Sequence, residues 1–338
     1  MNLPAAAWFG GQIGTQLLEV TDDVAALESE GRWAVLVTFE GEVTLARFGD
    51  WRPGSPAELA GRWVGPQPTA YSTSLDRDEY QSGVRRIRKL ISMGQVYQAN
   101  ICRTLSARMP SPQASDVFAL AALLERGNPA PFASALRLPD HGVNLACASP
   151  ELYIARAGAR IESSPIKGTA ETAEGLTDKD RAENVMIVDL VRNDLGRVCE
   201  VGSIEVPSLL RVEQHPTLVH LVSTVSGRLA ADAGWPEIFA GTFPPGSVTG
   251  APKSSALTAI AALEAVPRGP YCGAIGWVDA DAGTAELAVG IRSFWLDGDE
   301  LNFGTGAGIT WGSDPAGEWA ETELKAGNLV RVASQTWD

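Results

Sequence analysis

The chain has 338 residues, of which 45% are hydrophobic and 20% charged, a composition typical of a globular protein with a large core. Its net charge is −14, from 27 basic and 41 acidic residues, which argues against nucleic acid or an anionic membrane surface as the partner. The first residues lack a basic start, and no segment reaches the ~18 apolar residues of a membrane span. We therefore expect a cytoplasmic enzyme or binding protein.

The first part of the chain predicts one strand, one loop and one long helix. Residues 33–39, WAVLVTF, indicate a buried strand, and a loop rich in Pro, Gly and Trp follows at about 49–73. The first 70 residues otherwise show only a weak pattern. From Tyr80 to Ile91, apolar residues recur every three or four positions, which predicts an amphipathic helix that ends at Gly94.

The rest of the chain interleaves strands with helices. Residues 95–103 alternate like a strand, with Tyr97, Ala99 and Ile101 on one face and Gln98 and Asn100 on the other. Further strands are predicted at 132–138, 143–147 and 151–155, and helices at about 178–195, 252–265 and 315–333. Because no regular βαβ alternation connects these elements, the pattern favours an α+β fold.

The four cysteines lie far apart in the sequence, within apolar segments. They are Cys102, Cys147, Cys199 and Cys272. No spacing typical of a metal site connects them, so we expect buried, reduced thiols. None lies in the Gly-x-Cys-x-Gly motif of a glutaminase nucleophile.

The predicted helix at 178–195 carries carboxylates on a face that is otherwise apolar. Asp180 and Glu183 are three residues apart, and Ile187 and Val191 continue the same face. A carboxylate on a buried face is costly unless it is paired or bound to a metal. Pairing of Glu183 with an arginine and binding of a metal both remain open from the pattern alone.

The last predicted helix presents a second set of carboxylates. Glu318, Glu321 and Lys325 fall at i, i+3 and i+7 on one face, where a solvated Glu321–Lys325 ion pair is the alternative to a site. Two helices that offer carboxylates are also what Mg²⁺ needs, because this ion takes about six oxygen ligands, several of them from water and an anionic substrate.

Three other segments carry residues capable of chemistry. Glu151 opens a predicted strand after a Ser-Pro turn, and Lys167 stands in SSPIKGTAE between Pro-Ile and Gly. His220 lies in an apolar strand and, taken alone, is typical of a core histidine. Gly304, Gly306 and Gly308 alternate, which fits either a tight turn or a strand whose backbone closely approaches a ligand or another strand.

The segment FPPGSVTGAPKSSAL is similar to a phosphate-binding loop. It fails the motif because its lysine does not directly follow the second glycine. It still precedes a predicted helix, and the free N–H groups at a helix amino terminus bind anions.

Eight motifs together are more informative than any one of them. In order they are SPELY, SPIKGTAE, ENVMIVDLVRNDLGRV, HLVSTVSG, FPPGSVTGAPK, YCGAIGW, VGIRSF and GTGAGITWGSDPAGEWAETELKA. From about residue 75 to 330 the chain resembles the chorismate-utilising enzymes, which include the large subunits of anthranilate and aminodeoxychorismate synthases and the isochorismate and salicylate synthases. The resemblance implies a layered α/β/β/α sandwich of two packed, mainly antiparallel sheets. It also implies a catalytic domain over 75–333 with a shortened amino-terminal region, 1–74, packed on it.

The resemblance implies roles for individual residues. Glu183 and Glu321 match the glutamates that bind Mg²⁺, with Glu318 in the same shell. Glu151 matches the general acid/base, and His220 matches a histidine near the leaving hydroxyl. The positions implied to bind the substrate are Thr169, Thr249, Tyr271, Arg292, Gly306 and Lys325.

Two positions separate the reactions within this family. At the position of Lys167, members that form aminodeoxychorismate carry lysine, and anthranilate synthases typically carry alanine. A neutral amine there could attack C2 of chorismate while the C4 hydroxyl leaves with a proton, and ammonia would then attack C4 and expel the lysine. Gln98 stands where isochorismate and salicylate synthases place a lysine that activates water, so ammonia is the implied nucleophile.

The expected activity is therefore that of the aminodeoxychorismate-forming members, on the route to 4-aminobenzoate and from there to folate or a specialised metabolite. The alternatives are anthranilate formation and, in a different class, a non-catalytic chorismate-binding paralogue. A separate glutamine amidotransferase subunit is expected to supply ammonia. The family's tryptophan-pocket motif is kept only at Leu17, Leu18 and Glu19, which argues against tryptophan binding.

Overall fold

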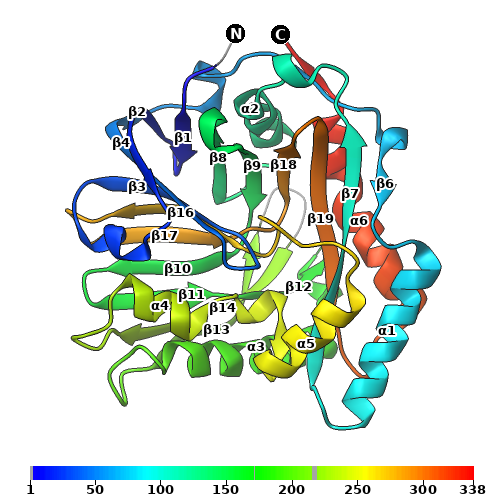
Figure 1. Cartoon of the computed structure of the whole chain (residues 1–338). Helices are drawn as coiled ribbons and strands as arrows, with labels where there is room; N and C mark the ends of the chain where they lie inside the picture. The colour runs from blue at the N-terminus through cyan, green and yellow to red at the C-terminus, as the bar shows by residue number, and fades with distance from the viewer. Residues whose placement is uncertain (1–2, 171, 215–218) are drawn as a thin grey trace.

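The computed structural model describes residues 3–170, 172–214 and 219–338. Both ends of the described chain lie at the same end of the molecule (Figure 1). Within these residues the α-helices are α1 (Arg77–Ser92), α2 (Val117–Gly127), α3 (Asp178–Leu195), α4 (Trp235–Thr242), α5 (Lys253–Leu263) and α6 (Pro315–Ala333).

Antiparallel hydrogen bonds connect 18 strands of the described chain into one continuous network, which has two halves. The first half-sheet contains β2 (Gln12–Thr21), β3 (Arg32–Val37), β4 (Val43–Pro53), β10 (Leu152–Ala157), β11 (Arg160–Ser164), β12 (Ile166–Ala170), β13 (Glu205–Gln214), β14 (Val219–Arg228), β16 (Ala274–Asp279) and β17 (Thr284–Val289). The second half-sheet contains β1 (Ala6–Phe9), β6 (Ser72–Thr73), β7 (Gln98–Arg108), β8 (Phe132–Leu138), β9 (Val143–Ser149), β15 (Gly250–Ala251), β18 (Ser293–Asp297) and β19 (Glu300–Ile309). Pairing of β1 with β2 joins the halves, and β5 (Trp63–Val64) pairs separately with β20 (Thr336–Trp337).

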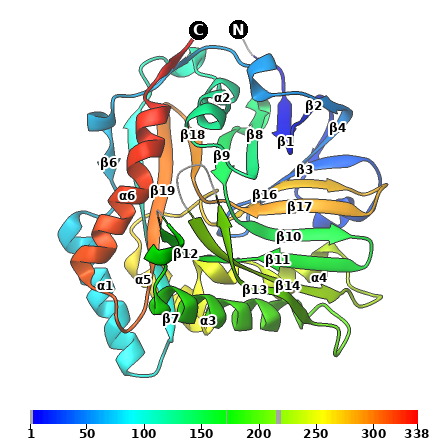
Figure 2. The same cartoon turned by 180° about the vertical axis from the view of Figure 1, so that it is seen from behind.

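The two half-sheets pack against each other and are covered by helices on their outer faces. Between them lies an apolar layer to which both contribute, including Leu36 and Phe48 from the first half-sheet and Leu136 and Leu145 from the second. The helices α3 and α4 cover the first half-sheet, whereas α2 and α6 cover the second (Figures 1 and 2). This arrangement confirms the predicted α+β class and the α/β/β/α layers, with the refinement that hydrogen bonds join the two sheets at one edge.

Most predicted elements are present with small shifts of their ends. The helices α3 and α6 have the predicted bounds, and α5 lies within the predicted 252–265. The prediction for Tyr97 was wrong: β7 begins at Gln98, and Tyr97 is 72% exposed, whereas Ala99 is buried. The helices α2 and α4 were not predicted.

The amino-terminal region is ordered in spite of its weak sequence pattern. Its strand β3 pairs with β16, with Val35 opposite Gly276, and β1 pairs with β8. The end of β4 lies within the segment that was predicted to be a loop. In β2, Leu18 is exposed and Glu19 forms an ion pair with Arg47. These strands therefore complete the same hydrogen-bonded network as the strands of the site.

Two further expectations can be compared with the structure. All four cysteines are buried and free of disulfides, as predicted. Among the described residues, no helix is long and apolar enough to span a bilayer.

The side chain of Asn184 fixes α3 against the strands beneath it. Its Nδ2 donates to Leu221 O at 2.8 Å and to Lys167 O at 3.4 Å, and its Oδ1 accepts from Ser223 Oγ at 2.5 Å. Asn184 is 1% exposed, so water cannot replace these bonds in the folded chain. The helix that carries Glu183 is thereby held in register with β12 and β14.

Replacing Asn184 with alanine is expected to lower the free energy of unfolding by about 3 kcal/mol, because Leu221 O loses the donor of Asn184 and the buried hydroxyl of Ser223 loses its acceptor, although Ser223 Oγ still accepts from Leu210 N. Urea denaturation followed by circular dichroism measures the change. Arg181→Ala, an exposed change on the same helix, should stay within about 0.5 kcal/mol of the unmodified chain. Equal losses for both variants would contradict this account of how α3 is anchored.

Candidate active site

The amine of Lys167 lies where β12 meets a turn of the chain near β7. Its Nζ donates to Ser247 O at 3.1 Å, and Asn100 Nδ2 donates to the same oxygen at 3.2 Å. Ser247 belongs to the short 3-10 helix η7 (Gly246–Val248). The next residue, Gly168, has φ +91°, and a Cβ there would lie 2.8 Å from Asp180 Cβ. Because residue 168 is a glycine, α3 can approach β12 directly beside the amine of Lys167.

The alternating glycines of β19 provide space for three different neighbours. A Cβ at Gly304 would lie 2.0 Å from the ring of Tyr271, and one at Gly306 would lie 2.5 Å from Cys102 Sγ. A Cβ at Gly308 would lie 2.3 Å from Gln98 Nε2 and 3.2 Å from Lys167 Nζ. Of the two possibilities left open by the sequence, the structure confirms a strand with close approach rather than a tight turn.

Gly308→Ala is expected to lower activity more than tenfold, because the methyl group would occupy the space beside Gln98 and Lys167. Steady-state kinetics on chorismate measures the change. Gly327→Ala is the matched control, since a Cβ there meets nothing within 4 Å on α6. That control should retain activity and stabilise the fold by about 0.5–1 kcal/mol. Equal activity of the two variants would contradict the assigned role of Gly308.

Burial moves the two candidate reacting groups toward their neutral forms. Desolvation lowers the pKa of Lys167, although the carboxylates of Glu183 and Glu151 oppose that change. Desolvation raises the pKa of Glu151, which is buried, although Ser247 and Lys167 oppose it. A neutral amine can act as a nucleophile and a protonated carboxyl as an acid, so the directions of both shifts suit the predicted roles.

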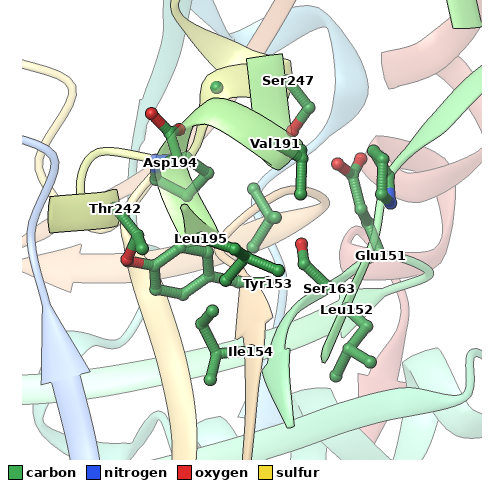
Figure 3. A pocket seen from close by; sticks show the side chains of 14 residues that line it. Glu151, Leu152, Tyr153, Ile154, Ser163, Val191, Asp194, Leu195, Thr242 and Ser247 are labelled. Carbon is green, nitrogen blue, oxygen red and sulfur yellow. The ribbon is translucent and has the colours of Figure 1, made fainter. Parts of the chain in front are cut away.

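A small cavity adjoins Glu151. Figure 3 shows Glu151 and Ser247 on one side of the cavity and Tyr153 and Thr242 on the other. Ser247 therefore lines this cavity and also offers its carbonyl oxygen to the amine of Lys167.

The lysine of the segment that is similar to a phosphate loop is already paired. Lys253 Nζ donates to Asp194 Oδ2 and to Thr242 O, both at 2.8 Å. This pairing does not support an anion site of the phosphate-loop kind at the start of α5, because the lysine's charge is balanced within the chain.

The predicted metal ligands lie on two helices, with Glu183 on α3 and Glu318 and Glu321 on α6. Glu183 is partly buried and Glu318 is buried. Desolvation raises the pKa of both carboxyl groups. Burial alone would raise the pKa of Glu321, but the ammonium of Lys325, 2.6 Å away, lowers this pKa below its usual value. Lys325 also donates to Gly306 O at 3.0 Å. The Glu321–Lys325 ion pair that the helix pattern allowed is therefore present, and both of its side chains are about half exposed.

The three carboxylates have the chemistry that a hard divalent cation needs, but they do not form a ready-made metal site. Among the described residues, no three His, Cys, Asp or Glu side chains are arranged so that they could hold a metal ion. The ammonium of Lys179 lies between Glu183 and Glu318 instead, at 3.6 and 3.7 Å from their oxygens. Glu183 Oε1 is nevertheless buried without a hydrogen-bond partner, which is the kind of oxygen that a cation would satisfy.

Three other predicted residues border the same region. Gln98 is fully buried, and its Oε1 has no hydrogen-bond partner. Thr249 is buried directly after η7, where its hydroxyl donates to Pro245 O or Gly246 O at 3.2 Å. Arg292 has φ +55°, and burial lowers its pKa, with the Glu151 carboxylate acting in the opposite direction.

The remaining predicted residues are less directly connected with Lys167. Tyr271 is buried with its hydroxyl 4.0 Å from Cys102 Sγ, and none of its described contacts reaches Lys167. His220 is buried in β14, where its backbone pairs with Thr169 and Glu213. The side chain of Thr169 lies outside the described part of the chain, so its predicted role stays a prediction.

Sequence reasoning missed several residues that shape this site. Asn100 shares a face with Gln98 in an alternating strand, and Lys179 precedes Glu183 by one helical turn, so patterns for both were available. Ser247 had no comparable signal, because it contributes its backbone carbonyl to Lys167.

A partly buried amine, a buried carboxyl group and a cluster of carboxylates on an α/β/β/α sandwich define an enzyme site for a small molecule. The model of the chorismate binding enzyme family matches residues 56–331, and the chain belongs to that family.

Relatives with two different activities are similar to the chain. It is 41% identical over 279 residues to an aminodeoxychorismate synthase of Streptomyces pristinaespiralis, covering 78% of this chain and 37% of that protein. It is 38% identical over 277 residues to an anthranilate synthase component 1 of Haloarcula marismortui, covering 78% and 55%. Aminodeoxychorismate synthase component 1 of Klebsiella aerogenes is 35% identical over 317 residues, covering 88% and 68%. The chain thus spans only about a third to two thirds of the length of these relatives.

Solved structures agree on the fold. Anthranilate synthase component I of Streptococcus pneumoniae superposes with a TM-score of 0.78 at 21% identity, covering 98% of this chain and 93% of that one. The menaquinone-specific isochorismate synthase of Escherichia coli superposes with a TM-score of 0.82 at 19% identity, covering 98% and 89%. At such low identity these similarities establish the sandwich fold alone.

Proposed function

We propose that the chain forms 4-amino-4-deoxychorismate from chorismate and ammonia, as the first component of an aminodeoxychorismate synthase. The observation that carries the proposal is the amine of Lys167, which is oriented by Ser247 O and surrounded by Glu151, Glu183 and Lys325. The names of two of the relatives support it.

The proposed reaction has two displacements. Lys167 Nζ forms a bond to C2 of chorismate while the C4–O bond breaks, and Glu151 gives the leaving hydroxyl its proton. Ammonia then forms a bond to C4, and the bond from C2 to Lys167 breaks, which regenerates the amine. Glu151 is the candidate acid because burial favours its protonated form. His220 is proposed to lie near the leaving hydroxyl.

Gln98 determines which nucleophile completes the reaction. Its amide cannot accept a proton from water as an amine can, so it provides no base for attack by water. We therefore assign C4 attack to ammonia and exclude isochorismate as the expected product.

Glu183 and Glu321, with Glu318, would hold Mg²⁺. When bound, the ion would neutralise a carboxylate of chorismate and orient it. The proposed substrate contacts of the chain itself are Thr169, Thr249, Tyr271, Arg292, Gly306 and Lys325. The guanidinium of Arg292 suits a carboxylate of the substrate.

Anthranilate formation is the alternative enzyme activity, because relatives of both kinds have similar identity to the chain. Lys167 separates the two: an amine on the C2 side directs ammonia to C4, whereas anthranilate requires nitrogen at C2 and loss of pyruvate. A non-catalytic paralogue is disfavoured, because Lys167, Glu151 and the three candidate metal ligands are all present.

The test of this proposal is a product assay with chorismate, Mg²⁺ and ammonium. Mass spectrometry should find aminodeoxychorismate, and an added aminodeoxychorismate lyase should convert it to 4-aminobenzoate. Anthranilate or isochorismate as the main product, or no turnover of chorismate, would overturn the proposal.

Glutamine is expected not to replace ammonium for this chain alone, because no cysteine lies in a glutaminase motif and all four are buried. Turnover with glutamine should stay at the background rate and rise when a glutamine amidotransferase subunit is added. A glutamate assay on the purified chain measures the reaction, and hydrolysis of glutamine without a partner would contradict the expectation.

A further inference from the structure

The carboxylates of Glu183, Glu318 and Glu321, here called the carboxylate cluster, lie beside a cation that belongs to the chain. Lys179 Nζ lies 3.6 Å from Glu183 Oε1 and 3.7 Å from Glu318 Oε1. Lys179 and Glu183 are on α3, one turn apart, whereas Glu318 is on α6. The ammonium group of Lys179 therefore bridges α3 and α6, two helices that are far apart in the sequence.

The ion pairs of Lys179 are long, and this leaves the cluster incompletely satisfied. Glu183 Oε1 is buried and has no partner within hydrogen-bond distance. Glu318 is 5% exposed, so its charge is also largely removed from water. An ammonium at more than 3.5 Å compensates these charges only in part, whereas a divalent cation would contact the oxygens directly at about 2 Å.

Lys179 can leave the cluster without disturbing the fold. Its side chain is 52% exposed, and beyond the carboxylates no hydrogen bond of its ammonium is described. The departing charge would be hydrated as on any surface lysine. By contrast, Lys325 is fixed to Glu321 and to Gly306 O. Of these two cations beside the cluster, Lys179 is the one free to exchange.

We propose that Lys179 is a tethered counter-ion that occupies the carboxylate cluster in the metal-free chain and is displaced when a divalent cation binds. This inference rests on the metal site of the proposed function. It adds that Lys179 balances the charge of the carboxylates when no metal is bound. It has a consequence for selectivity. A monovalent ion would gain little by replacing an ammonium of equal charge that is already tethered, so the lysine favours divalent cations.

The test is Mn²⁺ binding without substrate, measured by the electron paramagnetic resonance signal of free Mn²⁺. Lys179→Gln removes the competing cation and should bind Mn²⁺ roughly tenfold more tightly, because two partly exposed ion pairs no longer have to be broken. Lys179→Arg keeps the charge and should stay within about threefold of the unmodified chain. Arg181→Gln removes a charge from the exposed face of the same helix and should change the affinity less than about twofold.

Thermal unfolding gives a second readout that a merely structural lysine would not produce. In EDTA, Lys179→Gln should unfold at a lower temperature than the unmodified chain, because the cluster loses its counter-ion. At saturating Mn²⁺ the difference should disappear, because the lysine is already displaced. A loss of equal size under both conditions would overturn the inference.

Two results on Mn²⁺ binding would also be decisive. Equal or weaker binding by Lys179→Gln would show that Lys179 does not compete with the metal, while the metal site of the proposed function would stand. Absence of Mn²⁺ binding by the unmodified chain would overturn both. The two failures are therefore distinguishable.

Discussion

Lys167→Ala is expected to abolish formation of aminodeoxychorismate, with a loss of about 10³-fold or more in kcat. The variant has no amine to attack C2, and direct substitution at C4 by ammonia lacks the two-step route that the lysine provides. Because Lys167 Nζ makes one described hydrogen bond, to Ser247 O, the fold should tolerate the change. Rates are measured from product formation by mass spectrometry.

Lys89→Ala is the matched control for this variant, since Lys89 is exposed on α1, a helix that carries none of the candidate site residues. It should keep the rate of the unmodified chain. A Lys167→Ala variant that forms aminodeoxychorismate at the unmodified rate would show that the lysine is not the nucleophile.

Glu183→Gln is expected to lower kcat/KM roughly 10²-fold or more and to weaken Mn²⁺ binding in parallel. The substitution keeps the shape of the side chain but removes the charge that a hard cation needs. Turnover in the presence of EDTA should fall to a similar level in the unmodified chain. Both effects are measured with the product assay and with free Mn²⁺.

Asp189→Asn serves as the control, because it removes one charge from the exposed side of the same helix. It should leave metal binding and turnover unchanged. If Glu183→Gln binds Mn²⁺ as tightly as the unmodified chain does, the carboxylate cluster is not the metal site.

The long amphipathic and capped elements could be predicted from the sequence because their signals are local. The helix α3 begins after Thr177, which forms a capping box with Asp180, and α6 begins with Asp314 as its cap and Pro315 in its first turn. Both have the predicted bounds. The apolar positions of α3, including Ile187, face the core as its spacing indicated.

The missed elements have physical reasons. The helix α2 is apolar from Val117 to Leu124 and buried on all sides, so no amphipathic period marks it. The strands β1, β2 and β4 belong to a network that continues through β1 and β3 to the distant strands β8 and β16, and local patterns do not report such pairing. Tyr97 fits the alternation of this segment, but β7 begins one residue after it.

The candidate site was predictable as a set of residue types, but its contacts were not. Motif order identified Lys167, Glu151 and Glu183, whereas the orientation of the amine depends on Ser247 O and Asn100, which tertiary packing brings to it. The position of Lys179 between carboxylates of two helices likewise depends on how α3 and α6 meet. Distances between side chains on different elements are set by the fold as a whole.

The most direct test of the central claim is the mass of the peptide that contains Lys167 after incubation with chorismate and Mg²⁺ in the absence of ammonium. Attack at C2 with loss of the C4 hydroxyl predicts an increase equal to the mass of chorismate less one molecule of water, and the increase should disappear when ammonium is added before quenching. An unmodified Lys167 peptide from a chain that turns chorismate over would contradict the covalent route.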